Sequence, residues 1–152
     1  MKAVVQRVSQ ASVAVDGDIV GAIDKGFLIL LGVGVDDSHE DIEYLVSKIS
    51  QLRVFADKDG KMNLDIKAIE GNCLVISQFT LYANTKKGNR PSFIEAAPPD
   101  KAKTMFEEFC TQLSLQIGRK VATGIFAADM KVSLTNDGPV TIIYDSKNRK
   151  SG

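Results

Sequence analysis

The first 35 residues show the alternating and clustered apolar patterns of short β-strands. Strand-like runs cover Lys2–Val8 and Ser12–Val15, and the sequence DGD at 16–18 is typical of a hairpin turn before a third run, Ile19–Ile23. The next run, Phe27–Val35, is apolar on both of its faces, which predicts a central strand covered on both sides. We therefore expect the chain to open with a β-meander.

Two later stretches carry apolar residues at the spacing of amphipathic helices. The first helix is predicted to begin after Ser38, a good N-cap with Asp41 as its capping-box partner, and to end near Arg53. The second is predicted to begin at the Pro-Pro-Asp sequence 98–100 and to end at Gly118. The apolar stripes consist of Ile42, Leu45, Val46, Ile49 and Leu52 in the first helix, and of Ala102, Met105, Phe106, Phe109, Leu113 and Ile117 in the second.

The last strands are predicted to form a hairpin. Val132–Thr135 and Val140–Tyr144 are rich in β-branched residues and flank the turn sequence Asn-Asp-Gly-Pro at 136–139. Asn, Asp and Gly tolerate the positive φ angles of tight hairpin turns. Pro139 is unexpected there, because proline has no N–H for the ladder and restricts Gly138 before it. The sequence thus raises the question of why this turn is stiffened.

Further strands are predicted at RVFAD (53–57), Cys73–Ser77 and Lys120–Thr123. The strands arrive as hairpins, two long helices are interspersed, and no repeated βαβ unit is visible. This order predicts a mixed α/β fold, with largely antiparallel or mixed β-sheets packed together and the two helices covering one face. No linker or internal repeat divides the chain, so residues 1–152 are expected to form a single domain.

The charge balance of the chain bears on whether it binds nucleic acid. Nineteen Lys and Arg residues balance nineteen Asp and Glu residues, which argues against a wide, sequence-blind basic surface for nucleic acid. A compact basic patch remains possible, because the basic residues gather locally, although solvated loop and tail side chains explain the same groups. These groups are Lys86, Lys87 and Arg90 in the middle of the chain, and Lys147, Arg149 and Lys150 at its end.

The expected compartment is the cytoplasm. Cys73 and Cys110 lie far apart in sequence and show neither a disulfide framework nor a metal-ligand spacing. The first ten residues lack the apolar core of a signal peptide. The longest apolar run, Phe27–Val35, is too short to span a bilayer, so we expect no membrane partner.

Several familiar motifs are rejected. The stretch GVGVDD, Gly32–Asp37, has Asp37 at the third glycine position of a dinucleotide fingerprint and is interpreted as a strand end. DKDG at 57–60 has Ala68 where a calcium loop needs Glu, so it is interpreted as a turn. His39, the only histidine, lies beside a helix cap, which indicates neither a catalytic triad nor a metal site. If the protein is an enzyme, we therefore expect it to use no imidazole base, no metal ion and no other cofactor.

One polar stretch is a candidate site on its own. In SQFTLYA, Ser77–Ala83, the polar residues Ser77, Gln78 and Thr80 lie where an apolar strand ends and a basic loop, Asn84–Ser92, begins. Strand ends that open into loops often carry binding groups. The alternative is that these side chains only satisfy local backbone groups.

Two stretches together resemble a known family. SQFTLYA and NDGPVT are similar to the Ser-Gln-x-Thr and Asn-x-Gly-Pro signature motifs of the D-aminoacyl-tRNA deacylases. The likeness extends over essentially the whole chain, through MKAVVQRVSQASVAVDG, GFLILLGV, KGNRPSF and GPVTI. The resemblance implies hydrolysis of the ester that joins a D-amino acid, or glycine, to the terminal adenosine of tRNA. It also implies a homodimer of β-sheets with flanking helices and active sites at the subunit interface.

The resemblance further implies roles for two groups of residues. One pocket wall would consist of Ser77, Gln78, Phe79 and Thr80, with the N–H groups of Phe79 and Thr80 stabilising the developing oxyanion. The pair 138–139, Gly138 and Pro139, would have a cis peptide bond, project into the partner subunit's pocket and reject L-amino acids by shape. A stiff main-chain gate of this kind would answer the question that the proline raises.

Five more residues are assigned by the resemblance or by charge. Arg7 resembles the arginine that supports the Gly-Pro segment, and its alternative is an ordinary exposed strand arginine. Phe126 and Met130 resemble the residues that receive the terminal adenine, and plain core packing is their alternative. Lys86 and Lys87 are expected to contact phosphates of the tRNA acceptor end.

The mechanism and the function each keep an alternative. Thr80 has no nearby base to activate it as a nucleophile, so the preferred hypothesis is that the substrate's own ribose hydroxyl assists a water molecule. The rival functions are a non-catalytic nucleic-acid-binding module of the same fold, and a small-molecule-binding or assembly domain whose motifs are structural turns.

Overall fold

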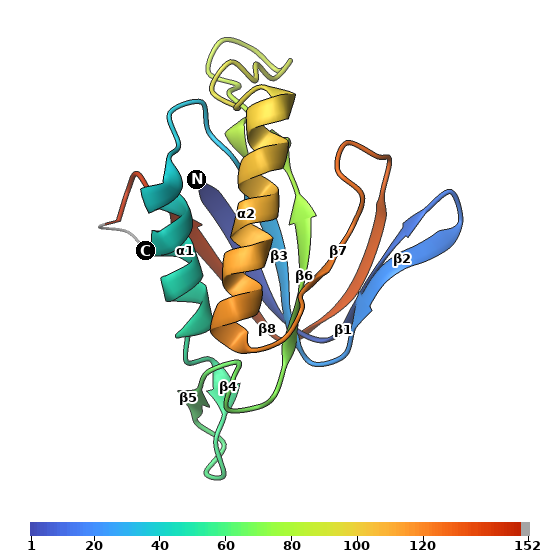
Figure 1. Cartoon of the computed structure of the whole chain (residues 1–152), viewed down its shortest axis with the longest axis vertical. Coiled ribbons are helices and arrows are strands. Elements are labelled where there is room, and N and C mark those ends of the chain that lie inside the picture. The colour runs from blue at the N-terminus through green and yellow to red at the C-terminus, as the bar shows by residue number, and fades with distance from the viewer. Residues whose placement is uncertain (150–152) are drawn as a thin grey trace.

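The computed structural model describes residues 1–149 and shows one curved six-stranded sheet with two helices (Figure 1). The order of the strands is β2-β1-β3-β6-β7, and β8 pairs with β1. The predicted mixed α/β fold is confirmed. The strands of this sheet are β1 (Lys2–Val15), β2 (Asp18–Ile23), β3 (Gly26–Gly32), β6 (Asn72–Ser77), β7 (Ala122–Thr123) and β8 (Lys131–Asp145), and β4 (Phe55–Ala56) and β5 (Met62–Leu64) form a separate hairpin.

Strand β1 organises the sheet. The two opening strands predicted from the sequence are parts of this single strand of 14 residues. Its first half pairs antiparallel with β3, from Lys2 opposite Gly32 to Val8 opposite Gly26, and its second half pairs with β2. Strand β8 also pairs antiparallel with β1 and follows it almost from end to end.

The predicted C-terminal hairpin is wrong. Lys131–Asp145 is one continuous strand, and both of its halves pair with β1 instead of with each other. Between the pairs Val8–Asn136 and Gln6–Thr141, β8 advances five residues while β1 advances two, so the intervening residues bulge out of the ladder. The turn-forming sequence is therefore used for a bulge, because the long β1 offers partners to both flanks.

The expected absence of repeated βαβ units is also wrong. Strands β3 and β6 run parallel, with Leu31 paired to Ser77, and β6 and β7 run parallel as well. The first crossover contains the helix α1 and the β4–β5 hairpin, and the second contains the helix α2. The hairpin inside the first crossover and the two-residue length of β7 hide this pattern in the sequence.

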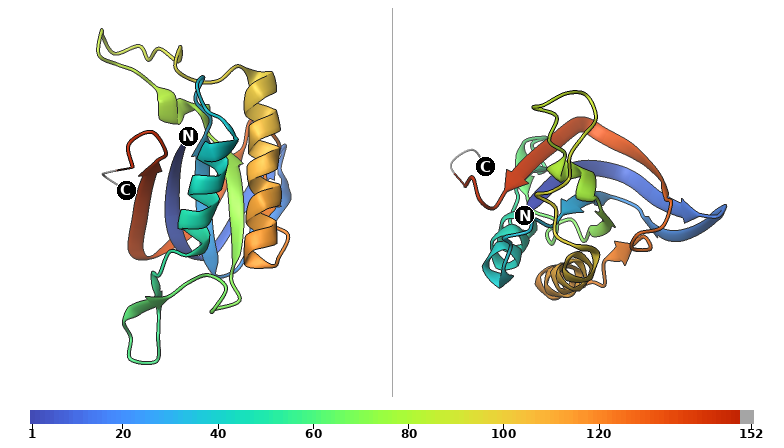
Figure 2. Two further views of the ribbon diagram at one scale, coloured as in Figure 1. Left: turned by 60° about the vertical axis from the view of Figure 1, so that its left-hand side comes forward. Right: turned by 90° about the horizontal axis from the view of Figure 1, so that it is seen from above.

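Both helices lie where the apolar stripes predict them. Helix α1 (His39–Ser50) begins with the expected capping box, in which Ser38 N–H donates to Asp41 Oδ2 at 2.8 Å, and α2 (Pro99–Ile117) ends at Gly118. The two helices cover the same face of the sheet (Figure 2). One core lies between helices and sheet, around Phe27 and Phe109. A second, around Leu28 and Leu74, fills the opposite face.

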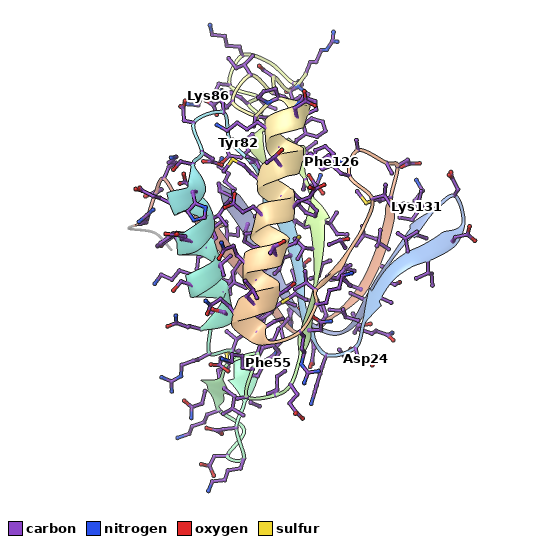
Figure 3. The ribbon with its side chains drawn as sticks, in the orientation of Figure 1. Asp24, Phe55, Tyr82, Lys86, Phe126 and Lys131 are labelled. Carbon is purple, nitrogen blue, oxygen red and sulfur yellow. The ribbon has the colours of Figure 1, made fainter. Side chains whose placement is uncertain are left out.

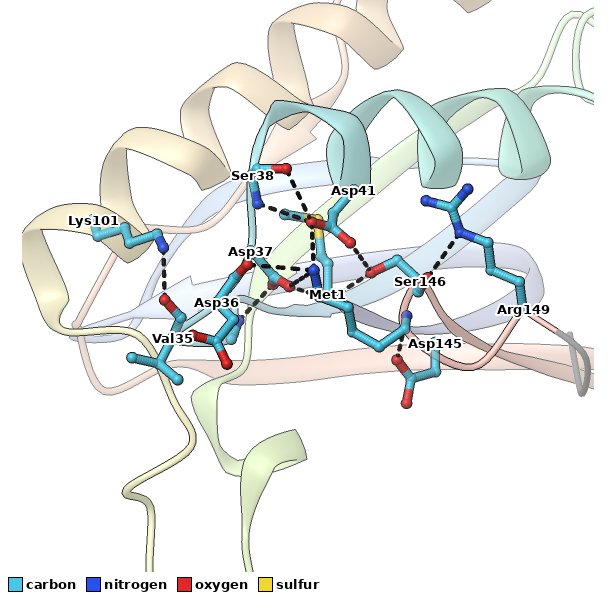
Figure 4. Close-up of polar contacts among 12 residues, drawn as sticks. Met1, Val35, Asp36, Asp37, Ser38, Asp41, Lys101, Asp145, Ser146 and Arg149 are labelled. Atoms are coloured by element: carbon cyan, nitrogen blue, oxygen red, sulfur yellow. Dashed lines mark hydrogen bonds and ion pairs between the residues drawn. The ribbon is translucent and has the colours of Figure 1, made fainter.

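A buried polar cluster ties the start of β1 to α1 and to the end of β8 (Figure 4). The Met1 ammonium group donates to Asp37 Oδ1 and to Ser146 Oγ, both at 2.7 Å. Ser146 Oγ in turn donates to Asp41 Oδ1 at 2.6 Å. Burial opposes ionisation of Asp41, but hydrogen bonds from Ser146, the Ser38 N–H and Lys147 outweigh it and hold the pKa of this carboxyl well below its usual range.

The C-terminal basic residues are engaged in this region rather than simply solvated. Lys147 Nζ donates to Asp41 Oδ2 at 3.1 Å, and the Arg149 guanidinium lies 4.1 Å from the centre of the Tyr44 ring. Lys150 lies outside the described residues. Within residues 1–149, no helix is both long and apolar enough to cross a membrane.

Candidate functional site

A pocket of about 650 Å³ lies beside the end of β6. Its walls come from the short 3₁₀ turn η1 (Phe79–Tyr82), from the segment that leads into α2, and from the loop between β7 and β8. Figure 3 shows Phe126, from that last loop, beside the upper part of α2. Five of the predicted site residues line this pocket: Ser77, Gln78, Phe79, Phe126 and Met130.

The chain turns sharply where β6 ends. Gln78 N–H donates to the Leu31 carbonyl at 2.8 Å, and the first bond of the turn runs from Leu81 N–H to the Gln78 carbonyl at 3.3 Å. The N–H groups of Phe79 and Thr80 precede this bond, so they have no acceptor within the turn. The Phe79 ring is half exposed and packs edge-to-face on Phe93, with 4.9 Å between the ring centroids.

The stretch GVGVDD is a strand end, as predicted, and it supports η1. A Cβ atom on Gly32 would lie 3.0 Å from the Gln78 carbonyl oxygen, and one on Gly34 would lie 2.8 Å from Tyr82 Oη. The Lys2 ammonium group lies 4.7 Å from the centre of the Tyr82 ring. Burial raises the pKa of Tyr82 well above its ordinary value. Because Gly32 and Gly34 have no Cβ atom, η1 packs closely against the end of β3.

Thr80 and His39 occupy positions that bear on the mechanism. Thr80 is exposed outside the pocket lining, and its Oγ1 accepts a hydrogen bond from Gln78 Nε2. His39 does not line the pocket either. Its ring lies between Glu43 of α1, 2.7 Å from Nε2, and Glu108 of α2, which contacts Nδ1. The structure thus places no histidine beside Thr80.

The Gly138-Pro139 peptide bond is cis, as the resemblance implies, and it lies in the exposed bulge of β8. Arg7 Nε donates to the Asp137 carbonyl at 2.8 Å, and Arg7 Nη1 donates to the Val54 carbonyl at 2.5 Å. Across the bulge itself, Val140 N–H donates to Asn136 Oδ1 at 2.9 Å. The bulge is therefore tied to β1 by Arg7 and closed between its own two ends by Asn136.

The two motifs do not meet within one chain. The bulge lies opposite Gln6–Val8 of β1, whereas Ser77 pairs with Leu31, which faces Ala3 of β1. Four residues along a strand and three strand spacings separate them by about 20 Å. Lys86 and Lys87 lie on the exposed loop between η1 and α2 and do not line the pocket. Figure 3 shows Lys86 at the same end of the molecule as Phe126 of the pocket wall.

Sequence analysis missed part of the pocket wall. Val33, Phe93, Ala97 and Ala102 also line it, and Ala97 N–H donates to the Val33 carbonyl at 2.9 Å. Ala102 belongs to the predicted apolar stripe of α2, which indicates core packing rather than a site. The useful signal was the group of apolar residues Phe93, Ile94, Ala96 and Ala97 within an otherwise polar connection.

Comparison with known proteins connects this geometry to a family. The family model described as D-Tyr-tRNA(Tyr) deacylase matches residues 4–145. The chain belongs to this deacylase family. Two bacterial relatives of this chain are each named D-aminoacyl-tRNA deacylase. The protein of Flavobacterium psychrophilum is 59% identical over 150 residues, which cover 99% of this chain and 100% of that protein. The protein of Thermotoga petrophila is 58% identical over 146 residues, covering 96% and 97%.

Two solved structures are similar in fold to this chain. A structure named c-Myc DNA Unwinding Element Binding Protein is 41% identical, with a TM-score of 0.91, and the match covers 95% of this chain and 98% of that one. A probable eukaryotic D-amino acid tRNA deacylase has a TM-score of 0.81 at 15% identity, covering 94% and 97%. At that identity, the second likeness concerns the fold alone.

Proposed function

We propose that this protein is a D-aminoacyl-tRNA deacylase, an ester hydrolase that releases a D-amino acid from the 3′ end of tRNA. The observation that carries the proposal is the placement of the Ser77–Thr80 turn at an apolar pocket of about 650 Å³. The N–H groups of Phe79 and Thr80 have no acceptor within that turn. Membership of the deacylase family supports the same activity.

The reaction replaces one ester bond by one acid and one alcohol. A water molecule attacks the ester carbonyl, negative charge develops on the carbonyl oxygen, and the ribose oxygen leaves with a proton. The N–H groups of Phe79 and Thr80 would stabilise the developing charge, as in an oxyanion hole. His39 lies between two helices instead of at the pocket, so the neighbouring ribose hydroxyl of the substrate is the better candidate to assist the water.

In this proposal, Thr80 positions the substrate instead of attacking it. Its Oγ1 accepts a hydrogen bond from Gln78 Nε2, so the hydroxyl is held by a neutral amide and not by a base. Thr80→Val removes the hydroxyl with little change in volume. Two results together would establish Thr80 as a nucleophile and contradict the substrate-assisted mechanism. The first is an acyl-Thr80 adduct trapped on wild-type protein. The second is a Thr80→Val variant that loses turnover but still binds tRNA.

The stereochemical gate requires a second copy of the chain. The bulge that contains Gly138 and Pro139 is exposed and lies about 20 Å from Ser77 of its own chain. Leu134 and Ile143 are apolar and exposed on the same strand, with exposed fractions of 36% and 66%. A homodimer that covers β8 would bury these side chains and let each bulge enter the other pocket. There, main-chain atoms would leave no room for an L side chain.

The same gate would admit glycine. Main-chain atoms that reject a side chain by shape have nothing to reject in a glycyl ester, because glycine has no Cβ atom. We therefore extend the proposed substrates to glycine attached to tRNA, including glycine mischarged on the tRNA for alanine.

A second candidate is a non-catalytic nucleic-acid-binding module, since one solved relative has a name that refers to binding a DNA element. Incubation of purified protein with D-Tyr-tRNA and L-Tyr-tRNA separates the two. The deacylase proposal expects rapid release of D-tyrosine and retention of L-tyrosine. Binding of tRNA without release of either amino acid would favour the module. Equal release of both would leave the hydrolase but remove the gate.

A further inference from the structure

Met130 lines the pocket, and its sulfur atom lies over the backbone of Gly124. A Cβ atom built on Gly124 would overlap Met130 Sδ. The same Cβ atom would lie 3.3 Å from Ile76 Cδ1 and 3.6 Å from Val13 Cγ2. The thioether of Met130 therefore occupies the space that a side chain at position 124 would need.

The reason for glycine at position 124 is this shared space and not its backbone conformation. The φ angle of Gly124 lies outside the left-handed region, so an L-residue could adopt the same backbone. A methyl group at this position would meet the far end of a flexible side chain, and that side chain would have to move. Ile76 and Val13 lie close to the new methyl group on other sides, and Met130 borders the pocket, which is open space into which its side chain can move.

The neighbouring wall residue is held differently. The Phe126 ring packs against Phe106 of α2, with 6.3 Å between the ring centroids. Phe126 faces the pocket on one side and, together with Gly124, lines a shallow groove on the other. The wall thus combines an aromatic ring packed on a helix with a movable thioether whose position depends on residue 124.

We propose that Gly124 is a specificity-determining residue, because it sets how far Met130 extends into the pocket and hence how much room the pocket leaves for the substrate. The packing relationship stands on the geometry alone. Its consequence for tRNA substrates rests on the proposed deacylase function.

The test is a pair of single variants and their combination, Gly124→Ala, Met130→Ala and Gly124→Ala/Met130→Ala. One additional methylene in an apolar pocket changes discrimination by about tenfold or more. Gly124→Ala is therefore expected to raise the KM for D-Tyr-tRNA on the order of tenfold, with a smaller change in kcat. In the Met130→Ala background the same change should have less than about a twofold effect, because the displaced atoms are gone. An equal increase in both backgrounds would overturn the inference. Gly17→Ala, in the open β1–β2 turn, is a control away from the pocket, and it bears in addition the backbone cost of a φ angle of +84° that Gly124→Ala does not have.

A second readout does not depend on activity. The chain has 4 methionines, so protein labelled with ¹³C at the methionine methyl groups gives few resonances. Gly124→Ala should move the Met130 resonance and leave those of Met1, Met62 and Met105 in place. An unmoved Met130 resonance contradicts the inference even if turnover changes. If wild-type protein releases no amino acid, the proposed function fails, while the methyl spectrum still decides the packing relationship.

The stability of the variants provides a third test. If Gly124→Ala alone does not fold, the shared-space argument requires that Met130→Ala restores the fold in the double variant. Thermal unfolding followed by circular dichroism measures this directly. A double variant that remains unfolded, beside a folded Met130→Ala single variant, would show that position 124 needs glycine for another reason.

Discussion

Arg7 Nε, on β1, donates a hydrogen bond of 2.8 Å to the carbonyl oxygen of Asp137, the residue immediately before Gly138 in the bulge of β8. The same guanidinium donates from Nη1 to the carbonyl oxygen of Val54 at 2.5 Å. One planar fork thus joins the bulge to the segment that precedes β4. Because a guanidinium presents its donors in fixed directions, it can hold both carbonyls at once, which a lysine ammonium on a flexible stem does less well.

We expect Arg7→Lys and Arg7→Ala to weaken the proposed gate without abolishing the fold. Hydrogen bonds from a charged donor contribute about 1.5–3 kcal/mol each, so loss of one or both should lower kcat/KM for D-Tyr-tRNA by roughly tenfold or more. Arg53→Ala is a matched control, since Arg53 Nε donates to the Asn63 carbonyl at 2.9 Å within the β4–β5 region. Full activity of Arg7→Lys would mean that the fork geometry is not needed.

Gly138 has a φ angle of +142°, in a region that L-residues rarely adopt. A Cβ atom there would also lie 2.8 Å from Val140 Cγ2 and 3.0 Å from Arg7 Nη2. Gly138→Ala should therefore cost about 1–3 kcal/mol for the backbone alone, with crowding in addition. Urea unfolding measures the stability, and hydrolysis of D-Tyr-tRNA measures the gate.

The control for Gly138→Ala is Gly60→Ala. Gly60 also has a positive φ angle, +77°, but no atom lies within 4 Å of its Cβ position. This variant should lose only the backbone contribution, about 1–2 kcal/mol, and should keep its activity. Equal stability losses in the two variants would contradict the crowding around Gly138.

The sequence predicted the helices well because their signals are local. The capping box of Ser38 and Asp41, the apolar stripes and the stop at Gly118 each depend on residues within a few turns of one another. The end of β6 at Ser77 was also predictable, because polar residues follow an apolar run directly. Ser77, Gln78 and Phe79, at the end of β6 and the start of the turn Phe79–Tyr82, line the pocket, and their roles there stay a prediction.

The errors concern pairing between distant segments. The flanks of Asn136–Pro139 look like two arms of a hairpin, and only the length of β1 reveals that both arms pair with it. The close approach of Met130 to Gly124 in the pocket could not be predicted for the same reason, because no sequence pattern indicates that contact. The distance of the bulge from Ser77 in one chain is likewise a property of strand order, not of either motif.

Lys86 and Lys87 lie on the exposed loop that follows η1, at the end of the molecule opposite the β4–β5 hairpin (Figure 1). If each contacts one phosphate of the single-stranded acceptor end, replacing both with Ala should flatten the slope of log K against log salt by about 1.4, since each such contact contributes about 0.7. Titration of a labelled, non-hydrolysable aminoacyl-tRNA analogue at several salt concentrations measures the slope.

The control for these lysines lies at the other end of the chain's long axis. Lys58 and Lys61 are exposed in the turn of the β4–β5 hairpin, and Lys58→Ala/Lys61→Ala removes the same charge. That variant should bind with an unchanged slope. Equal flattening in both double variants would point to net charge instead of to a contact by the loop, and an unchanged slope in Lys86→Ala/Lys87→Ala would remove the loop from tRNA binding.

His39 joins the two helices in a pH-dependent way. Its hydrogen bond with Glu108 raises its pKa above the ordinary 6.5, slight burial opposes this, and the charges of Glu108 and Glu43 reinforce it. Because the folded pKa is raised, the stabilisation is fully present below 6.5 and is lost as the pH rises through the folded pKa. His39→Ala should therefore lower Tm relative to wild type more at about pH 5 than at about pH 9.

Two further variants test the partner of His39. Glu108→Gln should reduce that pH dependence, whereas Glu40→Gln, which replaces an exposed acid in the first turn of α1, should not. A Tm difference between wild type and His39→Ala that is the same at both pH values would show that the histidine contributes by packing and not by its charge.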